Sequence, residues 1–307
     1  MRIAVVGAGG VGGGFGAALA KAGADVTFIA RGAHLAAMKR DGLKVQSPRG
    51  DTHLVPTQAT DNPAEIGIVD IVLFCVKLWD VESAGEAIKP LVGPDTAVIP
   101  LQNGIDAAER LIPILGPKAV MGGVAQISAS ITAPGVIQQV GTFMRMIFGE
   151  LDGKRSKRAE DFFALCQKAG FDVTLSEQIL TDLWMKFILL ACNASITAAT
   201  RQPLGKLRED ADLRPIMMAA FQETIDIGRA KGVTLPADAL AKILDFVGHA
   251  PPAMKASMAL DLERGNRLEL PWLNGKVVEL GRQLGVATPT HGMIYAMLKP
   301  YVMGKPV

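Results

Sequence analysis

The residues that most clearly suggest chemistry form a glycine-rich stretch near the start of the chain, VVGAGGVGGGFGAALAKAG, at positions 5–23. Its spacing G-x-G-x-x-G follows a short β-branched run and precedes an alanine-rich run that predicts a helix. In such a unit, one glycine allows a tight turn, the next lets the backbone approach a pyrophosphate, and the third lets the helix lie close to the strand. The N–H groups at the helix N-terminus then bind the anion. We predict a dinucleotide site formed by Gly7, Gly9, Gly10, Val11 and Gly12; a glycine-rich turn that binds no ligand is the alternative.

The end of the second predicted strand indicates which dinucleotide is bound. An NAD site usually carries Asp or Glu there, about 20 residues after the glycines, to bind the ribose 2′-hydroxyl. This strand ends in FIARG, which places Arg31 in that region and no acid. A guanidinium binds a 2′-phosphate through charge-assisted hydrogen bonds, whereas a carboxylate would repel it. The sequence therefore favours NADPH over NADH, with a solvent-facing loop arginine as the alternative.

Alternating strand and helix patterns in the first half predict the sheet that positions these residues. The predicted strands are 2–7, 24–30, 68–77, 96–102, 119–126, 136–140, 144–149 and 171–175, and the predicted helices are 15–23, 34–41, 80–91, 107–115 and 156–169. A polar turn at 47–51 predicts a hairpin. This order is typical of an α/β protein with a doubly wound, mostly parallel Rossmann-type sheet.

Strand patterns end at Leu175, and only helical patterns follow. The first predicted helix is 176–200, with Ser176 as its N-cap, and further helices are predicted at 213–231, 237–246, 252–264, 271–284 and 290–303. We therefore predict an NADP(H)-binding Rossmann-like domain at residues 1–175 and an all-helical domain at residues 176–307.

The composition of the 307-residue chain excludes several classes of function. Its formal net charge is only +2 and it has no long basic tract, so nucleic acid is not an expected partner. Three cysteines far apart in apolar stretches indicate buried free thiols in a reducing cytosol, and the four scattered histidines show no metal-site spacing. The first residues show no secretory pattern, and the uncharged stretch at 187–200 is too short to span a bilayer. We expect a cytoplasmic protein that binds neither a metal nor a membrane.

Motifs spread along the chain resemble those of one enzyme family. The first half has the GAGGVG opening with Arg31, CVKLWD at 75–80 and LQNG at 101–104; the second half has LWMK at 183–186, SMALD at 257–261, Glu269 and LNG at 273–275. In order and spacing they resemble the ketopantoate reductase (2-dehydropantoate 2-reductase) family over nearly the whole length. The resemblance implies NADPH-dependent reduction of ketopantoate to pantoate, a step of pantothenate biosynthesis, with substrate and catalytic residues on the helical domain.

The resemblance makes Lys186 the general acid that protonates the ketone oxygen. Hydride delivery to a carbonyl develops an alkoxide, which needs a positive donor nearby. The local sequence is consistent with this role, because Lys186 begins an apolar helical run and the next charged residue is Arg201. An unpaired lysine in apolar surroundings has a lowered pKa, which suits proton donation near neutrality. The alternative is a lysine whose amine reaches the surface at a helix start.

The resemblance also implies roles for four other residues. Lys77 and Asn103, which follow the carboxyl ends of predicted strands, would lie beside cofactor and substrate. Ser257 and Glu269 would hydrogen-bond the polar groups of the substrate, and we group Glu269 with Lys186 as catalytic. An Asn-Gly turn, a helix-surface serine and a solvated acid are the respective alternatives for Asn103, Ser257 and Glu269.

The chain departs from the family pattern near Lys186. The family usually has asparagines four and eight residues after this lysine, where this chain has Leu190 and Ala194. Asn193, seven residues after Lys186, lies on the same helical face and is the remaining amide expected to contact substrate. Ketopantoate remains the leading substrate, and because of this departure another 2-keto acid or a hydroxyketone with a more apolar side is a close second. A non-catalytic NADP(H) sensor is the alternative of another class, and pairing with a second copy of the chain is possible.

Overall fold

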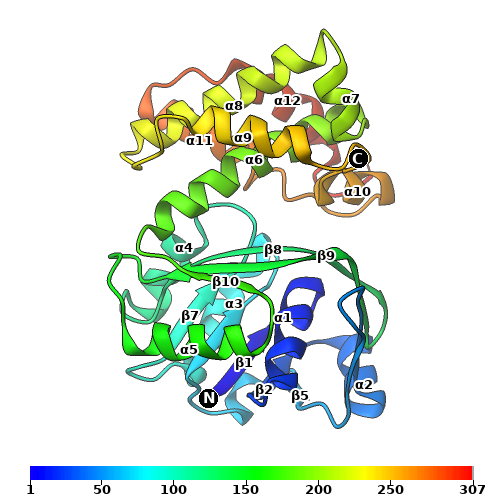
Figure 1. Cartoon of the computed structure of the whole chain (residues 1–307), viewed down its shortest axis with the longest axis vertical. Helices are drawn as coiled ribbons and strands as arrows, with labels where there is room; N and C mark the ends of the chain where they lie inside the picture. Colours follow the sequence, from blue (N-terminus) through cyan, green and yellow to red (C-terminus); the bar gives the residue numbers. More distant parts are fainter. Residues whose placement is uncertain (306–307) are drawn as a thin grey trace. The chain divides into compact units, whose positions relative to one another are not determined.

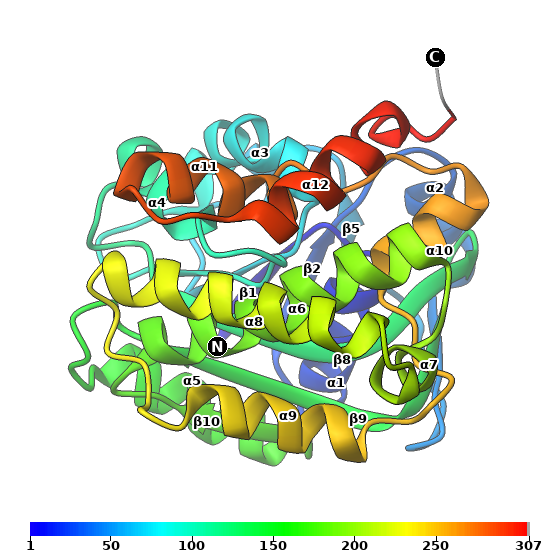
Figure 2. The ribbon, with the colours of Figure 1, turned by 90° about the horizontal axis from the view of Figure 1, so that it is seen from above.

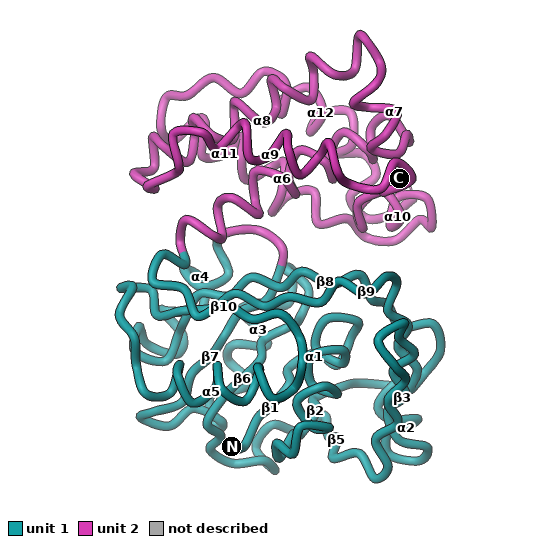
Figure 3. The backbone as a smooth tube through the Cα atoms, viewed as in Figure 1, with its two compact units in different colours: residues 1–102, 106–179 teal, residues 103–105, 180–307 magenta. Residues whose placement is uncertain are grey.

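The computed structural model describes residues 1–305, which form two compact units (Figure 1 and Figure 3). Unit 1 contains residues 1–102 and 106–179, and unit 2 contains residues 103–105 and the chain from Leu180 onward. The sequence predicts a division at 175/176, a few residues earlier. Residues just after 175 stay with unit 1 because the Ser176 N–H donates to the Phe148 carbonyl at 2.8 Å.

Unit 1 is built on a parallel five-stranded sheet with the order β5-β2-β1-β6-β7. Its strands are β1 (Arg2–Val6), β2 (Asp25–Ile29), β5 (Ala59–Thr60), β6 (Ile71–Phe74) and β7 (Ala97–Pro100). The interior strand β6 is buried along its whole length, as its continuous apolar sequence predicts for a strand covered on both faces. The strand order reverses beside β1, as in doubly wound dinucleotide-binding folds, so the predicted fold class is confirmed.

A second sheet in unit 1 was not predicted from the sequence. It has the order β10-β9-β3-β4, with β8 antiparallel to β9. Its strands are β3 (Leu43–Gln46), β4 (Thr52–Leu54), β8 (Gly122–Ala133), β9 (Val136–Gly149) and β10 (Asp172–Leu175). The strands predicted at 136–140 and 144–149 are one strand, and the intervening residues bulge out where the β8–β9 register shifts. The prediction of two strands was therefore wrong, because an exposed glycine-containing bulge resembles a turn in sequence.

The helices of unit 1 are α1 (Gly10–Lys21), α2 (Gly32–Asp41), α3 (Val81–Ala87), α4 (Ala107–Leu115) and α5 (Lys157–Lys168). Helix α1 packs against both sheets (Figure 1), and this position explains its many glycines. A side chain at Gly16 would meet Phe28 of the first sheet, and one at Gly13 would meet Ile137 of the second. Most glycines of α1 therefore serve close packing on two sides.

Unit 2 contains helices and no strand among the described residues (Figure 2). The helices are α6 (Ile179–Thr200), α7 (Leu204–Glu209), α8 (Leu213–Ala230), α9 (Ala239–His249), α10 (Ser257–Arg264), α11 (Asn274–Leu284) and α12 (Pro289–Leu298). Ser176 is not the N-cap of α6, contrary to the prediction; its hydroxyl accepts the Gln178 N–H at 3.0 Å, and the helix begins at Ile179.

Helix α6 is the core helix of unit 2. It is long and apolar enough to cross a membrane by length and composition. Its apolar residues, such as Phe187 and Ile188, are instead buried in one cluster with Phe221 of α8 and Val277 of α11. The apolar character of α6 is thus explained by packing inside unit 2.

The three cysteines are free thiols. Cys166 and Cys192 are buried and Cys75 is partly exposed. Burial raises the pKa of all three thiols, so the reactive thiolate is disfavoured at each position.

Candidate active site

The glycine-rich loop of unit 1 makes its turn directly after β1. Gly7 has a φ of +92°, and a side chain there would lie 2.9 Å from the Cys75 carbonyl oxygen, so only glycine fits. The N–H groups of Gly7 and Ala8 both donate to the Ile29 carbonyl, at 3.1 and 3.3 Å. These two bonds fix the start of the loop on β2.

The loop presents a row of unused hydrogen-bond donors. Gly9 is the N-cap residue of α1 and forms no side-chain capping bond. Its carbonyl accepts the Gly13 N–H at 2.7 Å. The N–H groups of Gly9, Gly10, Val11 and Gly12 have no acceptor among residues 1–305. Four adjacent N–H groups at a helix N-terminus form an anion-binding site, so these residues fit the pyrophosphate of a dinucleotide.

The glycines of the motif differ in the space around them. A side chain at Gly9 would meet no atom within 4 Å, which leaves that side of the backbone open to a ligand. A side chain at Gly10 would overlap the Ala129 carbonyl of β8, and one at Gly12 would overlap the Gly7 carbonyl. We infer that Gly9 is the position where a phosphate can approach the backbone, while Gly10 and Gly12 are required for packing and contribute only their N–H groups.

Arg31 and Lys77 lie at the same edge of the first sheet as the glycine-rich loop. Arg31 is the N-cap residue of α2, just after β2, and its exposed guanidinium has no partner among the described residues. Lys77 follows β6, and its ammonium lies 5.6 Å from the centre of the Trp79 ring. The carboxyl ends of β1, β2 and β6 thus bring these three features to the edge where doubly wound folds bind ligands.

Unit 2 brings together three predicted residues that are far apart in the sequence. The Lys186 ammonium donates to Asn103 Oδ1 at 3.3 Å, and Asn103 Nδ2 donates to Glu269 Oε2 at 3.3 Å. Lysine can only donate and a carboxylate only accepts, so these neighbours fix the orientation of the Asn103 amide. Asn103 immediately follows unit 1 in the chain but is part of unit 2.

The Lys186 ammonium is largely shielded from solvent. Burial lowers its pKa to about 8, and the nearby Glu269 carboxylate acts in the opposite direction. Glu269 itself is only 5% exposed. The ammonium is thus protonated at neutral pH yet able to release its proton, which is the property required of a general acid.

The remaining predicted residues are not hydrogen-bonded to this cluster. Asn193 is 6% exposed, and its Oδ1 accepts no hydrogen bond from the described residues. Leu190, between Lys186 and Asn193 along α6, is half-buried, whereas Ala194 is completely buried in the core of unit 2. Ser257 is exposed at the first residue of α10.

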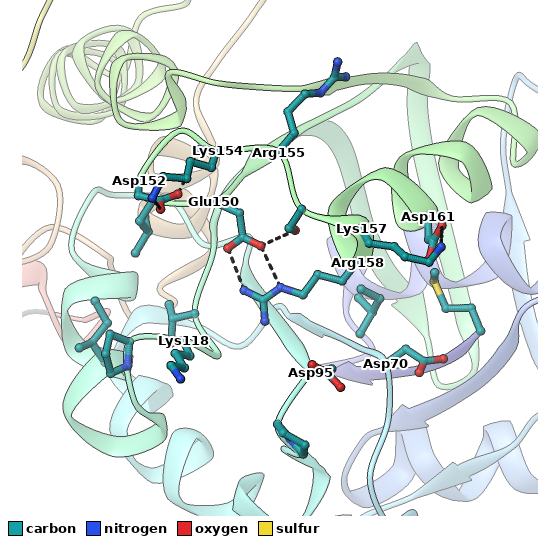
Figure 4. A pocket seen from close by; sticks show the side chains of 18 residues that line it. Asp70, Asp95, Lys118, Glu150, Asp152, Lys154, Arg155, Lys157, Arg158 and Asp161 are labelled. Atoms are coloured by element: carbon teal, nitrogen blue, oxygen red, sulfur yellow. Dashed lines mark hydrogen bonds and ion pairs between the residues drawn. The ribbon is translucent and has the colours of Figure 1, made fainter.

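A large hollow of unit 1, about 1460 Å³ in volume, is lined by none of the predicted site residues (Figure 4). It is found at the amino ends of β1 and β6, the opposite edge from the glycine-rich loop. Its charges are largely paired with one another: Arg158 binds Glu150 at 2.8 Å, and Lys157 binds Asp161 at 2.9 Å. In residues 1–305, no three His, Cys, Asp or Glu side chains are grouped to hold a metal ion.

One residue near the glycine-rich loop was missed in the sequence analysis. His34, in the first turn of α2, is hydrogen-bonded to the Ala8 carbonyl at 2.9 Å. A single histidine in a polar helical segment carries no sequence signal for this contact.

The fold and the comparisons with known proteins define a nicotinamide-dependent oxidoreductase that acts on a ketone. The model of the family Ketopantoate reductase PanE/ApbA matches residues 3–153, and the model of its C-terminal part matches residues 178–302. The chain belongs to this family.

Individual relatives match the chain from end to end. A 2-dehydropantoate 2-reductase of Mesorhizobium japonicum is 31% identical, with 97% of each chain covered. The crystal structure of a PanE/ApbA family ketopantoate reductase from Ralstonia eutropha superposes with a TM-score of 0.90 at 30% identity, covering 98% of each chain. The ternary structure of D-mandelate dehydrogenase with NADH and anilino(oxo)acetate shares the fold, with a TM-score of 0.89 at 19% identity and 98% of each chain covered.

Proposed function

We propose that the protein reduces 2-dehydropantoate to pantoate with NADPH, the reaction that serves pantothenate biosynthesis, in the cytoplasm. Family membership and the names of full-length relatives support this substrate. The observation that carries the proposal is the Lys186–Asn103–Glu269 cluster, because it holds an ammonium whose pKa is lowered to about 8. Reduction of a ketone needs such a donor.

The reaction adds a hydride to the ketone carbon and a proton to its oxygen. A bound reduced nicotinamide supplies the hydride. Lys186 stabilises the developing negative charge on the oxygen and donates the proton, and Asn103 holds the lysine amine in place. Glu269 opposes the loss of charge from Lys186, and its carboxylate can accept a hydrogen bond from a substrate hydroxyl.

Rates with a panel of 2-keto acids test the substrate assignment. Purified protein is mixed with NADPH and with ketopantoate, pyruvate, 2-ketoisovalerate or phenylglyoxylate, and the absorbance of the reduced nicotinamide is followed. We expect the highest kcat/KM with ketopantoate. Turnover of ketopantoate no faster than that of the other acids would contradict the assignment to this substrate but not the reaction class.

A second candidate is the same reaction on a 2-keto acid with a more apolar side chain. It is favoured by Leu190, which is half-buried one helical turn after Lys186 and offers no hydrogen bond to a substrate hydroxyl. The Asn193 amide is then available to bind substrate, since its Oδ1 has no donor among the described residues. A higher rate with 2-ketoisovalerate or phenylglyoxylate than with ketopantoate supports this candidate. NADPH binding without turnover of any acid would instead indicate a sensor.

The preference for NADPH is assigned to Arg31. Its guanidinium is exposed and has no partner within residues 1–305, so it is available to bind a 2′-phosphate. We expect Arg31→Ala to weaken NADPH binding about 10- to 100-fold, the range for lost hydrogen bonds to a charged group, and to leave NADH binding unchanged. Titration of nicotinamide fluorescence measures both Kd values. Lys39→Ala is the matched control, because it removes another exposed basic residue of the same helix. Equal losses of affinity for NADPH and NADH in Arg31→Ala would refute the assignment.

A further inference from the structure

His34 connects three segments of unit 1 that are distant in the sequence. Its Nε2 lies 2.9 Å from the Ala8 carbonyl in the glycine-rich loop, and its Nδ1 lies 3.0 Å from the Gly135 nitrogen at the tip of the β8–β9 hairpin. A backbone N–H can only donate, so Nδ1 accepts; Nε2 therefore carries the hydrogen and donates to the Ala8 carbonyl. Both ring nitrogens of the neutral imidazole are used.

The bond from His34 fixes one peptide group of the loop. In a trans peptide the carbonyl and the following N–H point in opposite directions, so an Ala8 carbonyl held by His34 turns the Gly9 N–H away from α2. That N–H is the first of the four donors without an acceptor, and the space beside Gly9 is open. If this peptide turned over, a carbonyl oxygen would face a bound phosphate and repel it.

The other side of His34 is anchored as well. Gly135 has a φ of +76°, and its carbonyl accepts the Lys44 N–H at 2.9 Å. The imidazole is thus held between the loop and the fixed tip of a long hairpin. The same helical turn begins at Arg31, so one short segment carries both the proposed 2′-phosphate ligand and the residue that orients the loop.

We propose that His34 is a positioning residue for dinucleotide binding, which keeps the Ala8–Gly9 peptide turned with its N–H toward the pyrophosphate. The inference rests on the dinucleotide site of the proposed function, but not on the identity of the keto acid. It differs from the role of Arg31 in one measurable respect. NADPH and NADH share the pyrophosphate, so a loss at His34 affects both cofactors equally.

The test is the Kd for NADPH and for NADH, measured on the full chain for the wild type and four variants. We expect His34→Leu and His34→Ala to weaken both cofactors by the same factor, about 5- to 20-fold, as for the loss of one hydrogen bond that orients a donor. We expect His34→Gln, whose amide can still donate to the Ala8 carbonyl, to recover most of the affinity. His53→Leu is the matched control, because it removes a histidine bonded to another backbone carbonyl of unit 1, that of Asp41, at 2.8 Å.

The outcomes distinguish failure of the positioning role of His34 from failure of the dinucleotide site itself. Wild-type affinity in folded His34→Leu or His34→Ala, confirmed by circular dichroism at the temperature of the titration, would overturn the positioning role alone. Loss of NADPH affinity with NADH affinity unchanged would also overturn it, since the effect would then lie at the 2′-phosphate. If His34→Leu does not fold, His34→Ala decides. A wild-type protein that binds neither cofactor would refute the dinucleotide site itself.

Discussion

Replacing Lys186 with alanine is expected to lower kcat at least ~100-fold, the lower range of general acid–base contributions, while the Kd for NADPH stays within about 2-fold. Without the ammonium, no group hydrogen-bonded to Asn103 could neutralise the alkoxide as it forms. Stopped-flow absorbance of the reduced nicotinamide measures the rate, and a fluorescence titration measures the affinity.

Two further variants separate the charge of Lys186 from its packing. Lys186→Met keeps an apolar stem in the half-buried position, and we expect it to be as slow as the alanine variant. Lys206→Ala, which removes an exposed lysine of α7, should keep the wild-type rate. A fully active Lys186→Met would show that the ammonium is not the proton donor.

The second large effect is expected at Gly9. The valine of Gly9→Val would meet no protein atom near its Cβ and would fill the space left for the phosphates, so the protein should fold normally. We expect cofactor affinity to fall at least ~100-fold, because overpacking is combined with the loss of hydrogen bonds to a charged group. Calorimetric titration with NADPH and thermal unfolding measure the two properties.

Gly12→Ala is the informative contrast, because its side chain would overlap the Gly7 carbonyl inside the loop. We expect this variant to lower the melting temperature, since overpacking a tight contact costs about 1–3 kcal/mol. Substitution of Gly9 should therefore lower cofactor affinity, whereas substitution of Gly12 should lower thermal stability. A Gly9→Val protein that binds NADPH as well as the wild type would show that the phosphates do not approach this loop.

Four strands of the parallel sheet, β1, β2, β6 and β7, were predictable from the sequence because they are short, mostly apolar runs; the two-residue strand β5 was not predicted. β6 is apolar and buried along its whole length and ends at Cys75, and β1 is apolar and buried after the exposed Arg2 and ends at the glycine-rich loop. The second sheet was not predictable for the opposite reason. The outer half of β8 is largely exposed, and that of β9 alternates buried residues with exposed apolar ones such as Val140 and Phe143. The pairing of β3 with β9 joins residues about 90 positions apart.

The candidate site was predictable only in part. The glycine spacing and Arg31 carry a local signal, because strand, loop and helix follow one another in the chain. Asn103, Lys186 and Glu269 are separated by 83 residues or more, and only the resemblance to a family suggested that they act together. The role of Gly10 in packing depends on β8, and the bonds of His34 depend on the hairpin tip. The local sequence around Gly10 and His34 identifies neither β8 nor the hairpin tip as the segment that each contacts.

The pH dependence of kcat/KM for the keto acid, which reports the pKa of the enzyme before the keto acid binds, tests the central claim most directly. Only the protonated Lys186 can donate a proton, and burial lowers its pKa from 10.5 to about 8. The account predicts a kcat/KM that is level below pH 8 and falls about tenfold per pH unit above it, a fall that is absent from the residual kcat/KM of Lys186→Ala. A wild-type kcat/KM that stays level from pH 7 to pH 10 would contradict the account.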